Sequence, residues 1–315
     1  MKVAIIYVGT LRTIKKTMKY FKQNVLLHSD VNVFACFEND TNIPDVETWL
    51  NDELGDHLKS LEWFSTNSDW IQHREFLLNN MNISDGTKNY LRNGGSMISY
   101  YRIQRAYIKM VHFERKCNFK YDYVIKVRTD TIFGKPVDFH WLDWSNEEVD
   151  TRVEKIKQEL VKSNIELSEN NIISYFMNTI ISDDIIPNIN NVWSGICKNR
   201  DNLPDIANLN EYIKNGSYIL TLRCDVLYII RRDLFDIIAH LGTMYGYMQY
   251  HGSQHNDWWN SETQLESVCY NANITSYNYA TDFDQRSICQ YKEEIYFDSD
   301  YNIINPYMIF CVVRN

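Results

Sequence analysis

The sequence predicts an α/β protein with a Rossmann-type, mostly parallel central sheet flanked by helices. Residues 2–8 (KVAIIYV) form a compact apolar run that is typical of a buried parallel strand. Helical spacing follows over residues 13–27, and residues 31–37 (VNVFACF) form a second apolar run. A strand, a helix and a strand in this order make a βαβ unit, which places the two strands parallel in one sheet.

Helices and strands are expected to keep alternating toward the middle of the chain. Residues 45–61 have a helical pattern, and residues 61–65 (LEWFS) predict a short strand. A long helix is expected to begin with Ser96 as its N-cap. It ends before residues 121–133 (YDYVIKVRTDTIF), which begin apolar and predict another strand.

The second half begins with an amphipathic helix over residues 145–164, which looks like an insertion into the fold. Ser145 is its expected N-cap, and Glu148 is expected to close a capping box. The elements expected after it are a strand pair over residues 217–232, a helix over 233–241, a helix capped by Ser261 and Gln264, and short strands over 293–299 and 307–315.

Composition and charge limit the classes of function. The chain has 315 residues, of which 44% are hydrophobic and 23% charged, as in an ordinary globular protein. Its net charge is -9 and its basic cluster, residues 12–22, is expected to be a solvated helix face, which argues against a nucleic-acid partner. The seven cysteines are scattered without a Cys-x-x-Cys pair, which favours a reducing compartment without a zinc site or a disulfide framework.

The amino terminus, MKVAIIYVGT, has too short an apolar run for a signal peptide. No later stretch approaches the roughly 18 uninterrupted apolar residues that a membrane span needs. The sequence therefore predicts a soluble cytoplasmic protein.

Charged side chains appear in the strand over residues 121–133 at Lys126, Arg128 and Asp130. Alternate side chains of a strand share a face, so these three are expected to point the same way, into the crevice where open α/β sheets bind ligands. A carboxylate there can hold a divalent cation that bridges a diphosphate, and an arginine can bind a phosphate oxygen. The alternative is that Arg128 and Asp130 only pair with each other or with neighbours.

The stretch YDYVIKVRTDTIF resembles the D-x-D region of GT-A glycosyltransferases, specifically small polysaccharide-building members from bacteria and large DNA viruses. The turn Gly9-Thr10-Leu11-Arg12 is similar to the G-x-x-R loop that lies near the nucleotide in that family. The helix before the motif and the helix start SETQLE resemble the family as well. The first acid of D-x-D is replaced here by Arg128.

This resemblance implies a GT-A-like fold and a hexosyl- or deoxyhexosyltransferase that moves a sugar from a nucleotide diphosphate sugar to a hydroxyl of a glycan or other acceptor. Residues 1–144 would bind the donor, 145–200 would form a helical insertion and 201–315 the acceptor side, all in one compact domain. The residues expected to bind a uridine or other nucleoside diphosphate are Gly9, Thr10, Arg12, Lys126, Arg128 and Asp130. Either Asp130 and another ligand hold Mn²⁺ or Mg²⁺, or the cationic side chains at the motif neutralise the diphosphate in place of a metal. A viral origin would place the protein in the host cytoplasm.

The stretch HGSQHNDWWNSE, residues 251–262, combines aromatic, basic and acidic side chains as a loop at the mouth of a pocket would. Its candidate bases are His251, His255, Asp257 and Glu262, and its candidate substrate-binding residues are His255, Trp258 and Trp259. The tryptophans would stack on sugar with His255 beside them, and Asp257 or Glu262 would orient or deprotonate the attacking hydroxyl. The alternatives are a solvated capping acid at Glu262 and histidines that serve only packing or the surface.

Three other functions compete with glycosyl transfer as interpretations of these motifs. A phosphatase of the D-x-D-x-T kind is excluded, because Ile132 stands two positions after Asp130. A nucleotidyltransferase shares the diphosphate chemistry but usually brings a glycine-rich phosphate loop that this sequence lacks. A nucleotide-sugar-binding module of the same fold, weak or inactive in catalysis, stays open because Arg128 replaces an acid.

Overall fold

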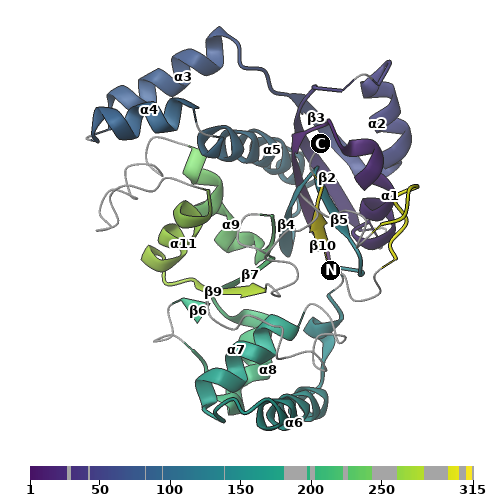
Figure 1. The fold of residues 1–315 in the computed structure, drawn as a ribbon, viewed down its shortest axis with the longest axis vertical. Helices are drawn as coiled ribbons and strands as arrows, with labels where there is room; N and C mark the ends of the chain where they lie inside the picture. Colours follow the sequence, from purple (N-terminus) through teal and green to yellow (C-terminus); the bar gives the residue numbers. More distant parts are fainter. Residues whose placement is uncertain are drawn as a thin grey trace. The chain divides into compact units, whose positions relative to one another are not determined.

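The computed structural model describes residues 1–26, 30–41, 43–81, 83–93, 95–137, 139–180, 197–198, 203–222, 226–242, 261–279, 297–304 and 310–313 (Figure 1). The chain divides into two compact units. Unit 1 comprises Met1–Lys15, His28–Asp130 and Ile229–Ala272, and unit 2 comprises Lys16–Leu27, Thr131–Tyr228 and Asn273–Asn315. Within the described ranges, no helix combines the length and the apolar character that crossing a membrane requires.

A sheet of mostly parallel strands forms the centre of unit 1. In spatial order its strands are β3 (Leu58–Trp63), β2 (Val31–Glu38), β1 (Val3–Thr10), β4 (Tyr123–Arg128) and β8 (Leu227–Arg231), the last belonging to this unit from Ile229 onward. β1 pairs in parallel with both β2 and β4, and β2 pairs in parallel with β3. Residues 3–8 of β1 are all buried, as expected for a strand covered on both faces. The predicted α/β class with a mostly parallel sheet is confirmed.

Unit 1 also contains the following helices. They are α2 (Val46–Leu54), α3 (Ser68–Asn79), α4 (Asp85–Asn93), α5 (Ser96–Cys117), α9 (Arg232–Ala239) and α11 (Ser261–Asn271), with short 3-10 turns at Gly55–His57 and His240–Gly242. The long helix α5 packs on β1, β2 and β3, and α3 and α4 lie together at one side of it (Figure 1).

Two sequence-based boundaries in unit 1 were wrong. The helix expected over residues 45–61 ends at Leu54, because Gly55 with φ 51° caps it, and strand β3 then begins at Leu58. Helix α5 has Gly95 as its N-cap, without a side-chain hydrogen bond, so Ser96 is its first residue and not its cap. The sequence analysis also missed α3, whose N-cap Asn67 accepts a hydrogen bond from the following turn.

A buried ion pair joins Glu114 of α5 to Arg232 of α9 in unit 1. Nε and Nη2 of Arg232 donate to the two carboxylate oxygens of Glu114 at 2.8 and 2.9 Å, and the Arg232 and Glu114 side chains are only 6% and 4% exposed. Arg232 also pairs with Asp236, and Glu114 accepts a hydrogen bond from the backbone N–H of Tyr121 at 3.1 Å. Burial acts to lower the pKa of Arg232, but its hydrogen bonds to Glu114 and Asp236 outweigh this and raise that pKa.

Unit 2 contains the remaining strands and helices. Strand β9 (Thr275–Tyr279) pairs in parallel with β7 (Tyr218–Leu222) and antiparallel with β6 (Cys197–Lys198), while β10 (Phe310–Val312) pairs antiparallel with β5 (Thr131–Phe133). Its helices are α1 (Ile14–Asn24) from Lys16 onward, α6 (Asn146–Lys162), α7 (Glu169–Thr179) and α8 (Leu209–Asn215), with 3-10 turns at His140–Asp143 and Ile206–Asn208. The capping box predicted for α6 at Ser145 and Glu148 is confirmed.

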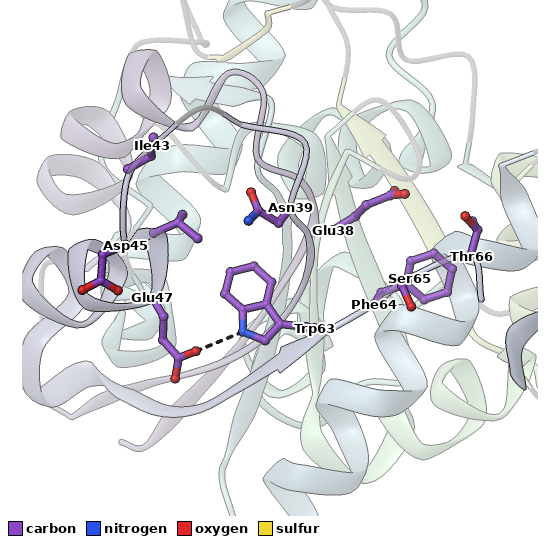
Figure 2. Close-up of a pocket in the computed structure, with 10 residues that line it drawn as sticks. Glu38, Asn39, Ile43, Asp45, Glu47, Trp63, Phe64, Ser65 and Thr66 are labelled. Carbon is purple, nitrogen blue, oxygen red and sulfur yellow. Dashed lines mark hydrogen bonds between the residues drawn. The ribbon is translucent and has the colours of Figure 1, made fainter. Parts of the chain in front are cut away.

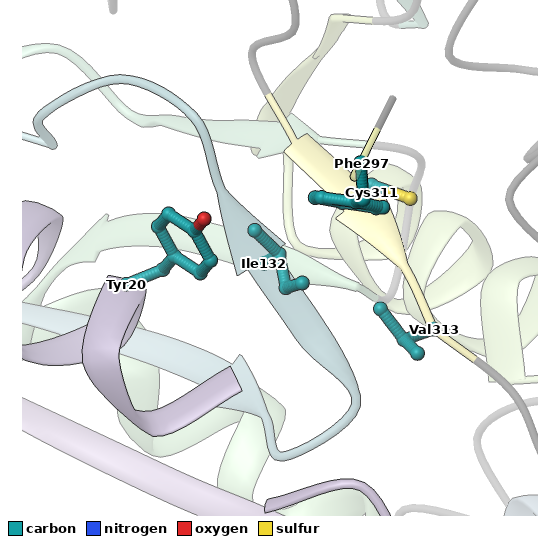
Figure 3. Close-up of a cluster of buried hydrophobic side chains, with 5 residues drawn as sticks. All are labelled: Tyr20, Ile132, Phe297, Cys311 and Val313. Carbon is teal, nitrogen blue, oxygen red and sulfur yellow. The ribbon is translucent and has the colours of Figure 1, made fainter. Parts of the chain in front are cut away.

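The carboxyl-terminal segment packs on helix α1 within unit 2. Tyr20, Ile132, Phe297, Cys311 and Val313 form a buried cluster (Figure 3). The Tyr20 hydroxyl donates to the carbonyl oxygen of Tyr301 at 2.6 Å, and the Lys16 ammonium donates to the Tyr301 hydroxyl at 2.6 Å. The basic residues 12–22 are therefore not only a solvated face, as the sequence suggested, because Lys16 and Lys19 donate hydrogen bonds to residues 300–302.

Cys311 corrects a second expectation. It is disulfide-bonded, whereas Cys36, Cys117 and Cys269 carry free thiols. The scattered spacing of the cysteines could not reveal this bond, because a disulfide depends on proximity in the fold and not on separation along the chain. Because disulfides form and persist in oxidising compartments, the cysteines no longer favour a reducing compartment.

Candidate functional site

Parallel strands of unit 1 end together at one edge of the sheet. Thr10, the last residue of β1, lies opposite Glu38, the last residue of β2. Val8 of β1 lies opposite Arg128, the last residue of β4, and the backbone N–H of Thr129 donates to the carbonyl of Val8 at 3.2 Å. Open α/β sheets bind ligands at the carboxyl ends of their strands, so this edge is the candidate site.

Gly9 and Thr129 fix the backbone at this edge. Gly9 has φ +149°, and a Cβ atom added to it would lie 2.2 Å from Oγ1 of Thr129. The same Oγ1 donates to the carbonyl oxygen of Thr10 at 2.5 Å, which ties the turn after β4 to the end of β1. A side chain at position 9 would separate the two strand ends, so the close approach requires glycine.

Arg128 and Asp130 form a bidentate ion pair beside this turn. Nε and Nη2 of Arg128 donate to the two carboxylate oxygens of Asp130 at 2.9 and 2.6 Å. The Asp130 side chain is 10% exposed and that of Arg128 is 25% exposed. β4 ends at Arg128, so Asp130 reaches its partner through the turn and not through the alternation of a strand. The pairing weighed as the alternative in the sequence analysis is thus present.

The arrangement of Asp130 bears on metal binding. Each carboxylate oxygen of Asp130 accepts one hydrogen bond from Arg128, and because an ionised carboxylate has about four lone-pair sites, both oxygens keep a further lone pair. Among the described residues there is also no cluster of three histidine, cysteine or acidic side chains that could hold a metal. Among the described residues, this position therefore offers one carboxylate and one arginine to a ligand.

The other predicted donor-site residues occupy different environments. Lys126 is fully buried in β4, opposite Ile6 of β1, whereas Arg128 is partly exposed. Arg12 is exposed in the turn after β1, and it makes no hydrogen bond or ion pair with any residue that the structure describes. The structure therefore brings Gly9, the Thr10 carbonyl and the Arg128–Asp130 pair to one place, with Arg12 available to solvent in the adjoining turn.

A cavity of about 660 Å³ opens where β2 and β3 end, beside the first turn of α2 (Figure 2). Its main side chains are Glu38 and Asn39 from the end of β2, Asp45 and Glu47 from the start of α2, and Trp63 and Phe64 from the end of β3. Trp63 is 40% exposed, and its Nε1 donates to Oε2 of Glu47 at 3.2 Å. Because Glu38 lies opposite Thr10, this cavity adjoins the glycine turn along the same sheet edge.

A buried arginine lies beneath this cavity. Arg102 of α5 pairs through Nη2 with Oε2 of Glu38, and its guanidinium carbon lies 4.6 Å from the centre of the Phe64 ring. The Arg102 side chain is 9% exposed and that of Glu38 is 31% exposed. Burial lowers the pKa of Arg102, while the nearby Glu38 carboxylate acts to raise it. Arg102 thus fixes one carboxylate oxygen of the cavity wall.

Sequence reasoning missed the cavity because it treated residues 45–61 as one helix. The signals that could have found it were Asp45 as an N-cap, the glycine at position 55, and the acid and tryptophan in LEWFS. Those features divide the segment into a short helix and a strand whose ends meet at the cavity.

The predicted acceptor-side residues are not tested by the structure. His251, His255, Asp257, Trp258 and Trp259 lie outside the described residues. Glu262 is the second residue of α11, and only its backbone is described. The expected capping box of this helix is not formed, since both side-chain amide atoms of Gln264 are buried and have no hydrogen-bond partner among the described residues.

Comparisons with known proteins gave only distant structural likenesses. No protein-family model and no curated protein matches the sequence. Core-mannan synthase A from Aspergillus fumigatus, solved in a Mn/GDP form, is 12% identical, with a TM-score of 0.32 over 88% of this chain and 73% of that one. The mannosyltransferase Ktr4p from S. cerevisiae in complex with GDP is 14% identical, with a TM-score of 0.31 over 88% of this chain and 69% of that one. Likenesses at this level carry no argument about the present site.

Proposed function

We propose that this chain is a GT-A-like glycosyltransferase that moves a sugar from a nucleotide diphosphate sugar to a hydroxyl of a glycan or other acceptor. The observation that carries the proposal is the shared sheet edge, where a glycine turn, an exposed arginine, an arginine–aspartate pair and a cavity adjoin one another. The resemblance of YDYVIKVRTDTIF to the D-x-D region of that fold supports the same function.

The carboxyl-terminal edge of the sheet can accommodate both parts of a donor nucleotide: its arginines match the diphosphate, and its cavity matches the nucleoside. Arg12, in the turn after β1, and Arg128, at the end of β4, would bind the diphosphate, on which negative charge grows as the sugar departs. Asp130 would hold the Arg128 guanidinium in the orientation that presents its outer edge to a phosphate oxygen. The cavity lined by Trp63 and Glu38 would hold the nucleoside.

Arg128 would supply the positive charge that a metal ion supplies where both acids of a D-x-D motif are present. The replaced acid and the engaged oxygens of Asp130 support this assignment. A divalent ion bound to Asp130 is the alternative, and it would share the carboxylate with Arg128. Nucleotide affinity measured in chelator and in manganese separates the two, because only the metal-dependent site loses affinity in chelator.

The first prediction concerns the donor site. Arg12→Ala is expected to weaken binding of a nucleoside diphosphate about 10-fold or more, because a charge-assisted hydrogen bond contributes roughly 1.5–3 kcal/mol. Arg128→Lys keeps the charge but loses the planar fork, so it is expected to weaken binding as well. Titration calorimetry with ADP, CDP, GDP and UDP measures both effects.

The control for these variants is Arg115→Ala, which removes an exposed arginine near the end of α5, away from the strand ends. It should bind nucleotide as the unmodified chain does. Unchanged affinity in both the Arg12 and the Arg128 variants would end the donor-site proposal.

The second prediction concerns the acceptor base. Asp257→Asn and Glu262→Gln keep shape and remove basicity, so turnover is expected to fall about 100-fold or more in the variant that replaces the base. Donor affinity should barely change, because the diphosphate would bind at the edge of β1 and β4. Glu266→Gln, one turn further along α11, is the matched control. Normal turnover in both variants would place the base elsewhere or indicate a retaining mechanism.

A nucleotide-sugar-binding module without turnover is the second candidate, and the replacement of an acid by Arg128 is the observation that favours it. Incubation with nucleotide sugars, followed by measurement of released nucleoside diphosphate, separates the two. Release above the rate without protein supports an enzyme, whereas tight binding with no release with or without glycan acceptors supports the module.

A further inference from the structure

We infer that one side of the cavity at the ends of β2 and β3 is a carbohydrate-binding subsite, in which a pyranose ring of a glycan stacks on Trp63. This inference rests on the proposed function only in naming a glycan as the source of that ring. The nucleoside of the proposed donor would then lie on the other side of the cavity, which Glu38 lines.

The strand ends divide the cavity into two sides. Trp63 of β3 pairs in register with Phe37, the residue before Glu38 in β2, so the side chains of Trp63 and Glu38 point to opposite faces of the sheet. Three polar side chains lie on the same side as the indole in Figure 2: Asn39, Asp45 and Glu47. These three residues and Trp63 form the Trp63 side of the cavity, and a ligand stacked on the indole meets them and not Glu38.

The indole of Trp63 is exposed and oriented. Its side chain is 40% exposed, and its Nε1 donates to Oε2 of Glu47 at 3.2 Å. This hydrogen bond restrains the ring before any ligand arrives, so little ordering is needed on binding. The face of a pyranose ring that carries C–H groups is apolar, and it can pack on the indole while the hydroxyl groups at the ring edge remain free to form hydrogen bonds.

The polar side chains beside the indole match hydroxyl groups. Asn39 accepts a hydrogen bond from the backbone N–H of Thr41 through Oδ1 at 3.3 Å, and its Nδ2 donates to no residue that the structure describes. Oε1 of Glu47 and Oδ2 of Asp45 also have no hydrogen-bond partner among the described residues. The Trp63 side thus offers an amide donor and two carboxylate acceptors. A hydroxyl both donates and accepts, so neighbouring sugar hydroxyls can use all three groups.

The charge of the Trp63 side argues against other ligands. Asp45 and Glu47 form no ion pair with a lysine or arginine in the described ranges, so their carboxylates repel a phosphate or another carboxylate. The described residues contain no group of three histidine, cysteine or acidic side chains that could hold a metal ion. A lysine side chain of a peptide is attracted by the carboxylates, but an ammonium accepts no hydrogen bond and cannot use the Asn39 amide. A neutral ring rich in hydroxyl groups uses every group present.

The test is an NMR titration of the full chain with maltose, cellobiose, mannobiose and chitobiose. It follows the indole N–H signal of Trp63, which is assigned by its absence in Trp63→Phe. At least one disaccharide is expected to shift this signal, with an affinity that is the same at low and high salt because the ligand is neutral.

Calorimetry with that disaccharide then compares variants. Trp63→Ala is expected to weaken binding about 10-fold, because the stacking surface is lost. Asn39→Asp keeps the acceptor for the backbone N–H of Thr41 but removes the amide donor, so it should also weaken binding. The control is Tyr90→Ala on α4, which removes an aromatic side chain that is 46% exposed and should leave the affinity unchanged.

Competing ligands separate the outcomes. A trilysine peptide that binds more tightly than every disaccharide, and gains affinity in Asn39→Asp, would show that the Trp63 side takes a cation. Nucleoside diphosphates that shift the Trp63 signal and lose affinity in Trp63→Ala would show that it takes part of the nucleotide. Either result, no shift with any of the four disaccharides, or disaccharide affinity unchanged in both Trp63→Ala and Asn39→Asp overturns the inference and leaves the proposed donor site standing. Disaccharide binding at Trp63 without binding of any nucleoside diphosphate overturns the proposed function and leaves the subsite standing.

Discussion

Replacing Glu114 by alanine is expected to lower the free energy of unfolding by about 3–5 kcal/mol, because it leaves the Arg232 guanidinium buried without its main partner. Two hydrogen bonds of 2.8 and 2.9 Å would be lost between side chains that are almost inaccessible to solvent. The backbone N–H of Tyr121 would lose its acceptor as well. Chemical denaturation followed by circular dichroism measures the change through the shift in midpoint.

Two further variants isolate the contribution of the buried charge. Glu154→Ala removes an acid that pairs with Lys157 on the surface of α6, where the Glu154 side chain is 62% exposed, and it should cost only about 0–1 kcal/mol. Replacing Glu114 and Arg232 together by leucine and methionine should cost less than Glu114→Ala alone, because no buried charge is then left unpaired. Asp236 would also lose Arg232 as a partner, but its side chain is 42% exposed. A loss in Glu114→Ala no larger than that in Glu154→Ala would contradict the importance of the pair.

Local patterns in the sequence were enough to predict the parallel sheet. The apolar runs of β1 and β2 carry almost no polar residues, and such runs occur where both faces of a strand are covered. The capping box of α6 was equally readable, because Ser145 and Glu148 satisfy each other's backbone N–H groups without help from distant residues. Elements of this kind depend on neighbours a few positions away, which is why the sequence reveals them.

Predictions from the sequence were wrong where contacts between residues far apart in the sequence determine the local structure. At Gln264 the S-x-x-Q pattern predicted a capping box, but packing buries this side chain without any hydrogen bond to the described part of the helix end. The boundary between α2 and β3 depends on pairing of β3 with β2, which a helical pattern over residues 45–61 does not report. Local propensity is overridden when such tertiary contacts contribute more.

The sequence predicted several residues of the candidate site but not the contacts between them. The charges at Arg128 and Asp130 stood out in an apolar strand, yet their bidentate pairing follows from the turn between them. Nothing in the order of residues links Arg102 to Glu38, because the two are 64 positions apart and meet only through the packing of α5 on the sheet. The cavity that they support was therefore invisible before the fold was known.

Replacing Gly9 by alanine is expected to lower the free energy of unfolding by about 3 kcal/mol or more and to weaken nucleotide binding with it. The backbone at φ +149° is strained for any residue with a Cβ atom, and that atom would lie 2.2 Å from Oγ1 and 3.2 Å from Cβ of Thr129. Thr129 cannot simply move aside, because its hydroxyl is bonded to the carbonyl of Thr10 at 2.5 Å. The turn after β4 would shift, and the Arg128–Asp130 pair would shift with it.

A double-mutant cycle with Thr129→Ala separates the clash from the backbone strain. Thr129→Ala alone should cost about 1 kcal/mol for its lost hydrogen bond. In that background Gly9→Ala should cost less than in the unmodified chain, since Oγ1 is gone, but a cost of about 1–3 kcal/mol should persist from the conformation of residue 9. Gly86→Ala in helix α4 is the control, because an added Cβ there meets only the Ser84 hydroxyl at 3.8 Å, and it should be neutral or slightly stabilising. Equal costs of Gly9→Ala in both backgrounds would mean that Thr129 does not confine position 9, and that the two strand ends are held together by their backbone pairing alone.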